Sequence, residues 1–148
     1  MESNIKGLVA AGHEMASELK AECGAVDTAR NIQSVFLVVR TSPVVMLVRN
    51  YSSLITMFGV SPASMIGGNG TPWLVGTSRI EKYQKTFLRH CRPVLQQMLA
   101  VYPRLENYVD ERNHVAKAWL HWLGFRLEEA APYGALGLNF HRFHMERK

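Results

Sequence analysis

The sequence contains no apolar run long enough to cross a membrane. A membrane-spanning helix needs roughly 18 consecutive apolar residues, and every apolar run in the 148-residue chain is much shorter. Gly12, His13 and Glu14 interrupt the short apolar patch that precedes them, which disfavours a secretory signal peptide. Hydrophobic residues make up 47% of the chain and charged residues 20%. This composition excludes a disordered or collagen-like chain and is typical of a globular domain.

Cysteine is scarce. The chain has two, Cys23 and Cys91, which are too few for a disulfide framework or a zinc site. Both fall on apolar faces of predicted helices, so we expect buried free thiols and a reducing compartment. His141 and His144 would point to opposite faces of a regular strand, and no metal site is expected. The sequence also lacks a Gly-x-Ser-x-Gly elbow and a Walker-type loop, which leaves hydrolases and nucleoside triphosphatases unsupported.

Acidic residues are fewer than basic ones, 12 against 17, so the net charge is +5 and the isoelectric point about 9.5. This balance permits an acidic partner, such as nucleic acid, an anionic cofactor or an acidic protein. Basic side chains gather on one face of a predicted helix: Arg79, Lys82, Lys85, Arg89 and Arg92. That face could follow a phosphate backbone. A solvated helix face is the simpler interpretation, and nucleic acid is not the partner we expect.

Apolar periodicity predicts the order of helices and strands. Residues 1–43 are expected to form a helical opening, with Ser3 and Asp27 as helix N-caps and Pro43 at its end. Residues 44–148 are expected to form a sheet core with one long helix over 79–102. The predicted strands of that core are Val44–Arg49, Leu54–Val60, Thr71–Gly76, Leu105–Val109, Phe125–Glu129 and Leu138–Met145, and the predicted helices are Arg79–Tyr102 and His114–Leu123.

The long helix has the clearest pattern. Its apolar residues recur at the helical spacing of about 3.6 residues, namely Ile80, Tyr83, Phe87, Cys91, Val94, Leu95, Met98 and Val101. Pro93 lies near its middle and should kink or break it, because proline removes a helical hydrogen bond. Gly124 is expected to end the following helix.

Three further features of the core can be predicted. The strand Thr71–Gly76 is expected to be buried and central. Trp119 and Trp122 match core positions of their helix. The apolar phase slips between Phe140 and Phe143, which predicts a bulge in the last strand.

The resulting order is ααβββαβαββ, which predicts an α+β fold with one mixed sheet flanked by helices. The unit made of Thr71–Gly76, the long helix and Leu105–Val109 is a βαβ crossover, so these two strands should pair in parallel. We find no linker or internal repeat, and residues 1–148 are expected to be a single domain.

The run Asn113-His114-Val115-Ala116, followed by Trp122-Leu123-Gly124-Phe125, resembles the GNAT superfamily of N-acyltransferases. Members often carry Asn-x-x-Ala at a late helix start and Leu-Gly-Phe at its end. The resemblance implies a GNAT-like sheet and an acyl-coenzyme A cofactor, acetyl-coenzyme A or a related thioester. It also implies acyl transfer to an amine.

A closer likeness is to GNAT-like proteins of short-tailed phages, among them the family of internal virion protein A. The similar stretches are Met57–Val60, Gly70–Thr77 and Tyr102–Val109. This resemblance implies a phage protein in the host bacterial cytoplasm, or in the virion, with a host protein as acceptor or partner. The oligomeric state does not follow from it.

The resemblance implies that the cofactor lies along the strand before the long helix and on the turn that follows. The implied residues are Trp73, Leu74, Val75, Gly76, Thr77, Ser78, Arg79 and Lys82, with Asn113 and Ala116 at the later helix start. A strand amide near Trp73–Val75 would polarise the thioester carbonyl. The turn departs from the family's Gln/Arg-x-x-Gly-x-Gly/Ala pattern, because Ser78-x-x-Glu81 reads as a capping box that competes with a pyrophosphate.

A second departure concerns the general acid, since many members place a tyrosine where this chain has Leu120. Tyr108 and His121 are the candidates for that role, with Tyr83 as a further one. Glu106 is the candidate base, with Asp110 and Glu111 behind it. The candidate catalytic residues are therefore Tyr108, Glu106 and His121.

Two functions remain open at this point. The chain is either an acyl-coenzyme A-dependent N-acyltransferase or a binding protein on the same scaffold that has lost catalysis and acts by contacting a host protein or in virion assembly or ejection. The altered turn and the missing tyrosine favour the second, and the Asn-x-x-Ala run favours the first. Fold by itself does not decide between them.

Overall fold

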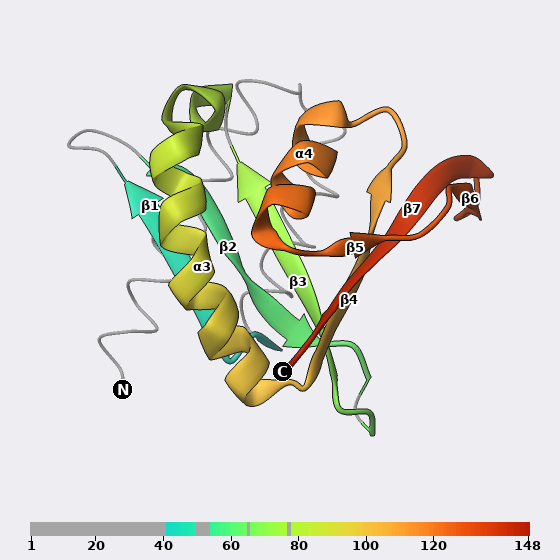
Figure 1. Cartoon of the computed structure of the whole chain (residues 1–148), viewed down its shortest axis with the longest axis horizontal. Coiled ribbons are helices and arrows are strands. Elements are labelled where there is room, and N and C mark those ends of the chain that lie inside the picture. The colour runs from blue at the N-terminus through green and yellow to red at the C-terminus, as the bar shows by residue number, and fades with distance from the viewer. Residues whose placement is uncertain (1–40, 50–53, 65, 77) are drawn as a thin grey trace. The chain divides into compact units, whose positions relative to one another are not determined.

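The computed structural model describes residues 41–49, 54–64, 66–76 and 78–148. The two helices expected before Pro43 lie outside the described residues, and so do Cys23 and Thr77. The strands form a seven-stranded mixed sheet in the order β1-β2-β3-β4-β7-β5, with β6 paired to β7 off this path (Figure 1). No helix among the described residues is long and apolar enough to span a membrane.

The elements follow the predicted order closely. Their bounds are β1 Val44–Arg49, β2 Leu54–Pro62, β3 Asn69–Gly76, the 3-10 helix η1 Ser78–Tyr83, α3 Gln84–Val101, β4 Arg104–Asp110, α4 His114–Leu123, β5 Arg126–Leu127, β6 Ala131–Tyr133 and β7 Leu138–Glu146. The α+β class and the mixed sheet are confirmed, as is the parallel pairing of β3 with β4.

The chain divides into two compact units. Unit 1 comprises Met1–Ser61 and Trp73–Phe87, and unit 2 comprises Pro62–Pro72 and Leu88–Lys148. The expectation of one domain over residues 1–148 remains a prediction.

In unit 1, β1 and β2 form the expected antiparallel pair, from Val44↔Val60 to Arg49↔Leu54. The middle of β2 is packed so tightly that Gly59 has no room for a side chain. A Cβ there would lie 2.3 Å from the carbonyl oxygen of Val44 and 3.0 Å from the ring of Trp73. The indole of Trp73 also donates to the Ser42 hydroxyl at 2.8 Å.

In unit 2, β4 and β7 pair without interruption from Arg104↔Glu146 to Asp110↔Phe140. The prediction of a bulge in the last strand is therefore wrong along the β4–β7 ladder. Phe143 packs edge-on against Phe125, whereas Phe140 contacts Tyr133. The apolar phase slips because the two faces of β7 each hold an aromatic contact.

The long helix begins later than predicted and does not break. Ser78–Tyr83 is a 3-10 helix, and α3 then runs from Gln84 to Val101 through Pro93. Cys91, Val94 and Leu95 are buried on either side of this proline. Their packing holds together a helix that has lost one internal hydrogen bond.

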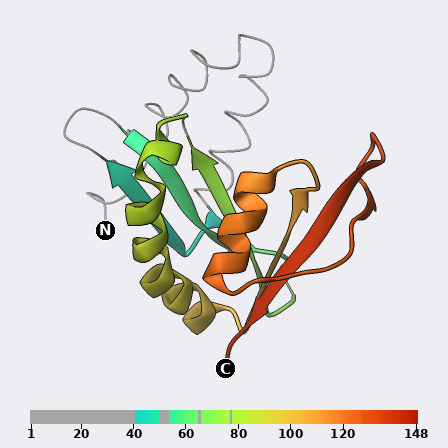
Figure 2. The ribbon, with the colours of Figure 1, turned by 45° about the horizontal axis from the view of Figure 1, so that its top comes forward.

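Three smaller expectations also fail. Leu74 is 44% exposed, so β3 is not a fully buried strand. Trp122 is 44% exposed and its ring is covered by Arg92, so it is not a core residue. β5 spans only Arg126–Leu127, and the short strand β6 was not foreseen; both run beside β7 (Figure 2).

Candidate active site

The parallel strands β3 and β4 pair only where they begin. Among the described residues, their register comprises Asn69↔Arg104 and Gly70↔Leu105. Pro72 follows on β3, and a proline has no N–H with which to continue a ladder. The main-chain pairing of these two strands therefore ends within a few residues of its start.

Beyond this point the two strands are joined by a hydrogen bond from the side chain of Asn107. Its amide donates to the carbonyl oxygen of Pro72 at 2.7 Å, and its own oxygen accepts from the N–H of Tyr108 at 2.8 Å. Asn107 was not among the predicted site residues. A signal was available, because the alternation Leu105-x-Asn107-x-Val109 places an amide on the apolar face of the strand.

Glu106 lies on the opposite face of β4, inside an ion-pair network. Its Oε2 accepts from Arg142 at 2.6 Å and from Arg104 at 3.1 Å, and Arg104 also pairs with Glu146. Partial burial raises the pKa of Glu106, but the hydrogen bonds and charges of the two arginines outweigh burial and hold this pKa below its ordinary value. A carboxylate of this kind is ionised and fully engaged at neutral pH.

Tyr108 shares the face of β4 that carries Glu106. Its ring stacks on that of Tyr133, with centroids 3.8 Å apart and planes within 10°. The residue is 39% exposed. Asp110 follows on the same face, and hydrogen bonds from Arg112 lower the pKa of Asp110 to about 2. Tyr108 is therefore a phenol held by stacking on a charged, accessible strand face.

His121 does not join Tyr108 and Glu106. It lies in the last turn of α4, and the residues that directly follow this helix pack on the other face of the sheet. A Cβ added at Gly124 would lie 3.6 Å from Met145, and Phe125 contacts Phe143. The structure thus brings Glu106 and Tyr108 to one face of β4, whereas α4, which carries His121, ends against the opposite face.

Asn113 and Ala116 have a clear local role. Asn113 is the N-cap of α4, and its side-chain oxygen accepts from the N–H of Ala116 at 3.1 Å. Gly124 closes the same helix in the left-handed conformation, with φ of 99°. The Asn-x-x-Ala run and the Leu-Gly-Phe ending are therefore the two caps of one helix.

The candidate phosphate residues lie in unit 1, on η1. The α-helix does not begin at this turn, which corrects the expectation that the long helix would start at Arg79. Arg79 is half-buried and donates to the carbonyl oxygen of Leu54 at 3.3 Å. Lys82 is exposed, with its ammonium 5.7 Å from the ring centroid of Tyr83.

The strand before this turn is fixed by contacts with β2. Val75 offers its carbonyl oxygen to the hydroxyl of the fully buried Thr56 at 2.8 Å. Trp73 is held against Gly59, as described above, while Leu74 remains largely exposed. The last residues of β3 are thus rigidly held on one side and accessible at Leu74.

Acetyl-coenzyme A is the cofactor that the resemblance implies, and its pyrophosphate needs cationic partners. Arg79 and Lys82 supply two positive charges on η1, against one exposed carboxylate, that of Glu81. This donor set fits a pyrophosphate. Among the described residues, no group of three or more histidine, cysteine, aspartate or glutamate side chains gathers as metal ligands.

No protein-family model matches the sequence, and no curated protein matches it. Solved structures match the fold. A putative GNAT-family acetyltransferase from Desulfovibrio desulfuricans is 10% identical with a TM-score of 0.66, over 91% of each chain. A probable GNAT-family acetyltransferase from Chromobacterium violaceum is 16% identical with a TM-score of 0.61, over 82% of this chain and 69% of that one.

A variant spermidine N-acetyltransferase from Vibrio cholerae is 10% identical with a TM-score of 0.61, over 80% of this chain and 75% of that one. At these identities the likeness establishes the fold. The chain therefore has the fold of the GNAT-family acetyltransferases, as its helix-capping runs and its element order led us to expect.

Proposed function

We propose that this protein is an N-acyltransferase that moves an acyl group, acetyl in the simplest case, from coenzyme A to an amine. The observation that carries the proposal is the early end of the β3–β4 pairing, at Pro72 and Asn107, in a chain with the GNAT fold. Strand backbone that is not used in a ladder can hydrogen-bond the amide groups of a pantetheine arm.

The residues that would hold the cofactor are those of the β3 end and of η1. Trp73, Leu74, Val75 and Gly76 would line the arm, and Thr77, Ser78, Arg79 and Lys82 would meet the phosphates. When bound, the thioester supplies an activated acyl group. A main-chain N–H near Trp73–Val75 would stabilise the negative charge that develops on its carbonyl oxygen. Asn113 and Ala116, which form the α4 cap, are the two further residues proposed to bind the cofactor.

Tyr108 is the residue we propose as proton donor to the departing thiolate. Its ring is fixed by Tyr133 on a face that carries Arg142 and Glu106. Glu106 is better suited to hold Arg142 than to remove a proton, because a lowered pKa makes a carboxylate a weak base. His121 is the other candidate for a proton-transfer role.

The experiment compares Tyr108→Phe with Tyr133→Phe, a matched control that removes the same atom from the partner ring. Each variant is incubated with acetyl-coenzyme A and a panel of amines, including spermidine and a lysine peptide, and acetylated product is measured by mass spectrometry. Tyr108→Phe is expected to lower kcat by about a hundredfold or more, and Tyr133→Phe to leave it nearly unchanged. Equal rates for both variants would remove Tyr108 from the proposal.

The proposal extends to the amine that accepts the acyl group and to the phage origin of the protein. The likeness of Met57–Val60, Gly70–Thr77 and Tyr102–Val109 to phage GNAT-like proteins supports a phage protein that acts on a host bacterial protein. Incubation of a bacterial lysate with isotope-labelled acetyl-coenzyme A should then label particular host lysines. Labelling no higher than that of a protein-free control would argue against a host acceptor.

The alternative is a binding protein on the same scaffold that no longer catalyses. Glu81 on η1 and Leu120 at the expected tyrosine position favour it. It predicts no acetylated product, so the same incubations distinguish it from the enzyme.

A further inference from the structure

Unit 2 carries a groove of about 840 Å³ that is separate from the proposed cofactor residues. It is lined by the second half of α3, by the turn between α4 and β5, and by the end of β7. Its apolar lining comes from Leu95, Leu99, Leu123 and Met145. Grooves of this size accept a ligand of several residues or a drug-sized molecule.

The charged lining of this groove is mainly positive. Arg92, Arg126 and Arg147 contribute to it, and Glu146 contributes the carboxylate. Glu146 is paired with Arg104, outside the groove lining. Across the part of the chain that the structure describes, no carboxylate lies within ion-pair distance of Arg92, Arg126 or Arg147. The groove therefore holds a local excess of positive charge.

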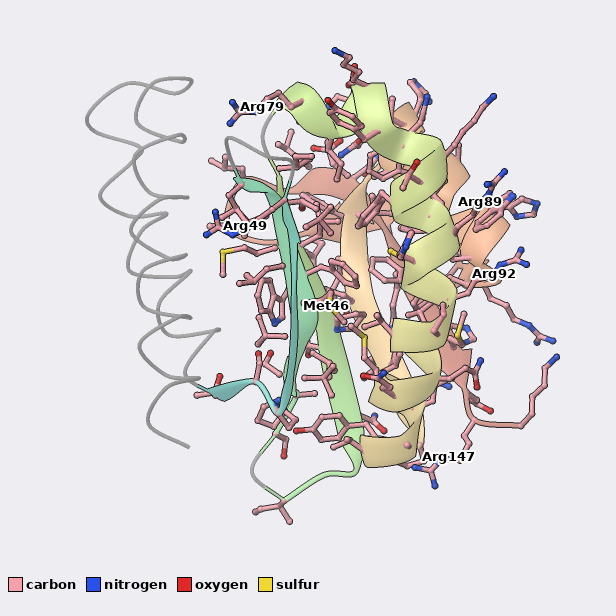
Figure 3. All side chains as sticks on the ribbon, turned by 90° about the vertical axis from the view of Figure 1, so that its left-hand side faces the viewer. Met46, Arg49, Arg79, Arg89, Arg92 and Arg147 are labelled. Atoms are coloured by element: carbon pink, nitrogen blue, oxygen red, sulfur yellow. The ribbon has the colours of Figure 1, made fainter. Side chains whose placement is uncertain are left out.

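Two of these guanidinium groups are held in place by neutral partners. Arg92 lies over the ring of Trp122, 4.0 Å from its centroid, and donates to the Trp122 carbonyl oxygen at 3.4 Å. Arg147 donates to the carbonyl oxygens of Leu99 and Ala100 at the end of α3, at 2.5 and 3.0 Å. Figure 3 shows Arg92 projecting from α3 and Arg147 at its C-terminal end. Fixed guanidinium groups bind an anion with little further loss of side-chain entropy.

We infer that this groove is a docking site for an acidic peptide segment of a partner protein, with carboxylates on Arg92, Arg126 and Arg147 and apolar side chains on the Leu95–Leu99 lining. Charge complementarity selects an anionic occupant, because the three cations have no carboxylate partner of their own. The apolar lining favours a peptide, whose aliphatic side chains can fill it, over a nucleic acid, which is held chiefly through hydrogen bonds to its phosphates and sugars. This site is independent of acyl transfer.

The test measures binding of a fluorescein-labelled peptide of four Glu-Leu repeats to the full chain by fluorescence anisotropy at low salt. Arg126→Gln and Arg92→Gln are each expected to weaken binding about tenfold, because each removes a charge-assisted hydrogen bond. Arg126 makes no ion pair with any described residue, so its variant should keep its fold even if loss of the Arg92–Trp122 contact destabilises the other.

Arg89→Gln is the matched control, since Arg89 is exposed on the same helix but does not line the groove. It should bind like the unmodified protein, and peptides of Gln-Leu or Glu-Ser repeats should bind more weakly than the Glu-Leu peptide. Equal weakening by Arg89→Gln would show unspecific charge attraction and overturn the inference. Absence of binding near 1 mM peptide would overturn it too, as would tighter binding of a single-stranded oligonucleotide that depends on the same arginines.

Discussion

The side-chain amide of Asn107 lies 2.7 Å from the carbonyl oxygen of Pro72, at the place where the main-chain pairing of β3 and β4 has ended. One side chain thus ties together two parallel strands that no longer share a ladder. The same amide oxygen accepts from the N–H of Tyr108, so Asn107 also fixes the backbone of the proposed proton donor.

Replacing Asn107 by alanine should therefore destabilise the protein. The substitution removes a part-buried hydrogen bond to the Pro72 carbonyl oxygen and an exposed one from the Tyr108 N–H. Because the Pro72 carbonyl oxygen loses its partner, the change is expected to cost about 1–3 kcal/mol of the free energy of unfolding. Urea unfolding of the variant and the unmodified protein measures this change in the free energy of unfolding. Asn139→Ala, at an exposed position of β7, is the control and should change stability by less than about 0.5 kcal/mol. An equally small change for both variants would show that the Asn107 contact contributes nothing.

Gly59→Ala is expected to be strongly destabilising. Its new methyl group would meet the Val44 carbonyl oxygen at 2.3 Å, and the main chain of a paired strand cannot move away freely. Overpacking of this kind typically costs about 1–3 kcal/mol or more. Gly67→Ala serves as the control, because its nearest neighbour would be the Ser64 hydroxyl oxygen at 3.5 Å. A melting temperature for Gly59→Ala equal to that of the control would contradict the tight contact.

The ion-pair network around Glu106 predicts a pH dependence of stability. Because Arg104 and Arg142 hold the pKa of Glu106 below its unfolded value, the network stabilises the fold above the unfolded pKa. That contribution is lost as the pH falls through the lower folded pKa. The difference in unfolding free energy between the unmodified protein and Glu106→Gln should thus be largest near neutral pH and shrink in acid. A difference that stays constant from neutral pH down to about pH 3 would argue against the network.

Cys91 is expected to be unreactive in the folded protein. It is 4% exposed, and burial raises the pKa of its thiol to about 12, so almost no thiolate forms near neutral pH. Iodoacetamide at pH 8 should modify it only after unfolding in urea, as read by peptide mass spectrometry. Rapid modification under native conditions would show that α3 opens readily from the core.

Much of the fold could be predicted from local patterns in the sequence. The β1–β2 pair and the parallel β3–β4 pair follow from apolar alternation and a crossover, and the C-terminal end of α4 follows from Gly124. The role of Asn113 as the N-cap of α4 was not predicted. Pro93 misled the prediction because burial of Cys91, Val94 and Leu95 outweighs one lost helical hydrogen bond. The late start of α3 was also missed, since a 3-10 helix and an α-helix share the same polar and apolar residues over a short stretch.

The candidate site was harder to predict from sequence. Tyr108 and Glu106 share a face because both lie on β4 with the strand's period of two, and that could be read directly. His121 was grouped with them, although the side of the sheet on which α4 packs depends on Phe125, Phe143 and Met145. Pro72, which accepts from Asn107, and Arg142, which pairs with Glu106, come from distant segments, and local periodicity does not reveal such contacts.

The most direct test of the proposed acyl transfer is a thermal-shift titration with acetyl-coenzyme A, with free coenzyme A and ATP as comparisons. At about 100 times the dissociation constant, binding should add roughly 2.7 kcal/mol of stability, a rise of several degrees in Tm. We predict this rise with both coenzyme A forms, none with ATP, and a smaller rise for Lys82→Gln than for Lys85→Gln. No shift at millimolar acetyl-coenzyme A would contradict a working cofactor site at Trp73–Lys82.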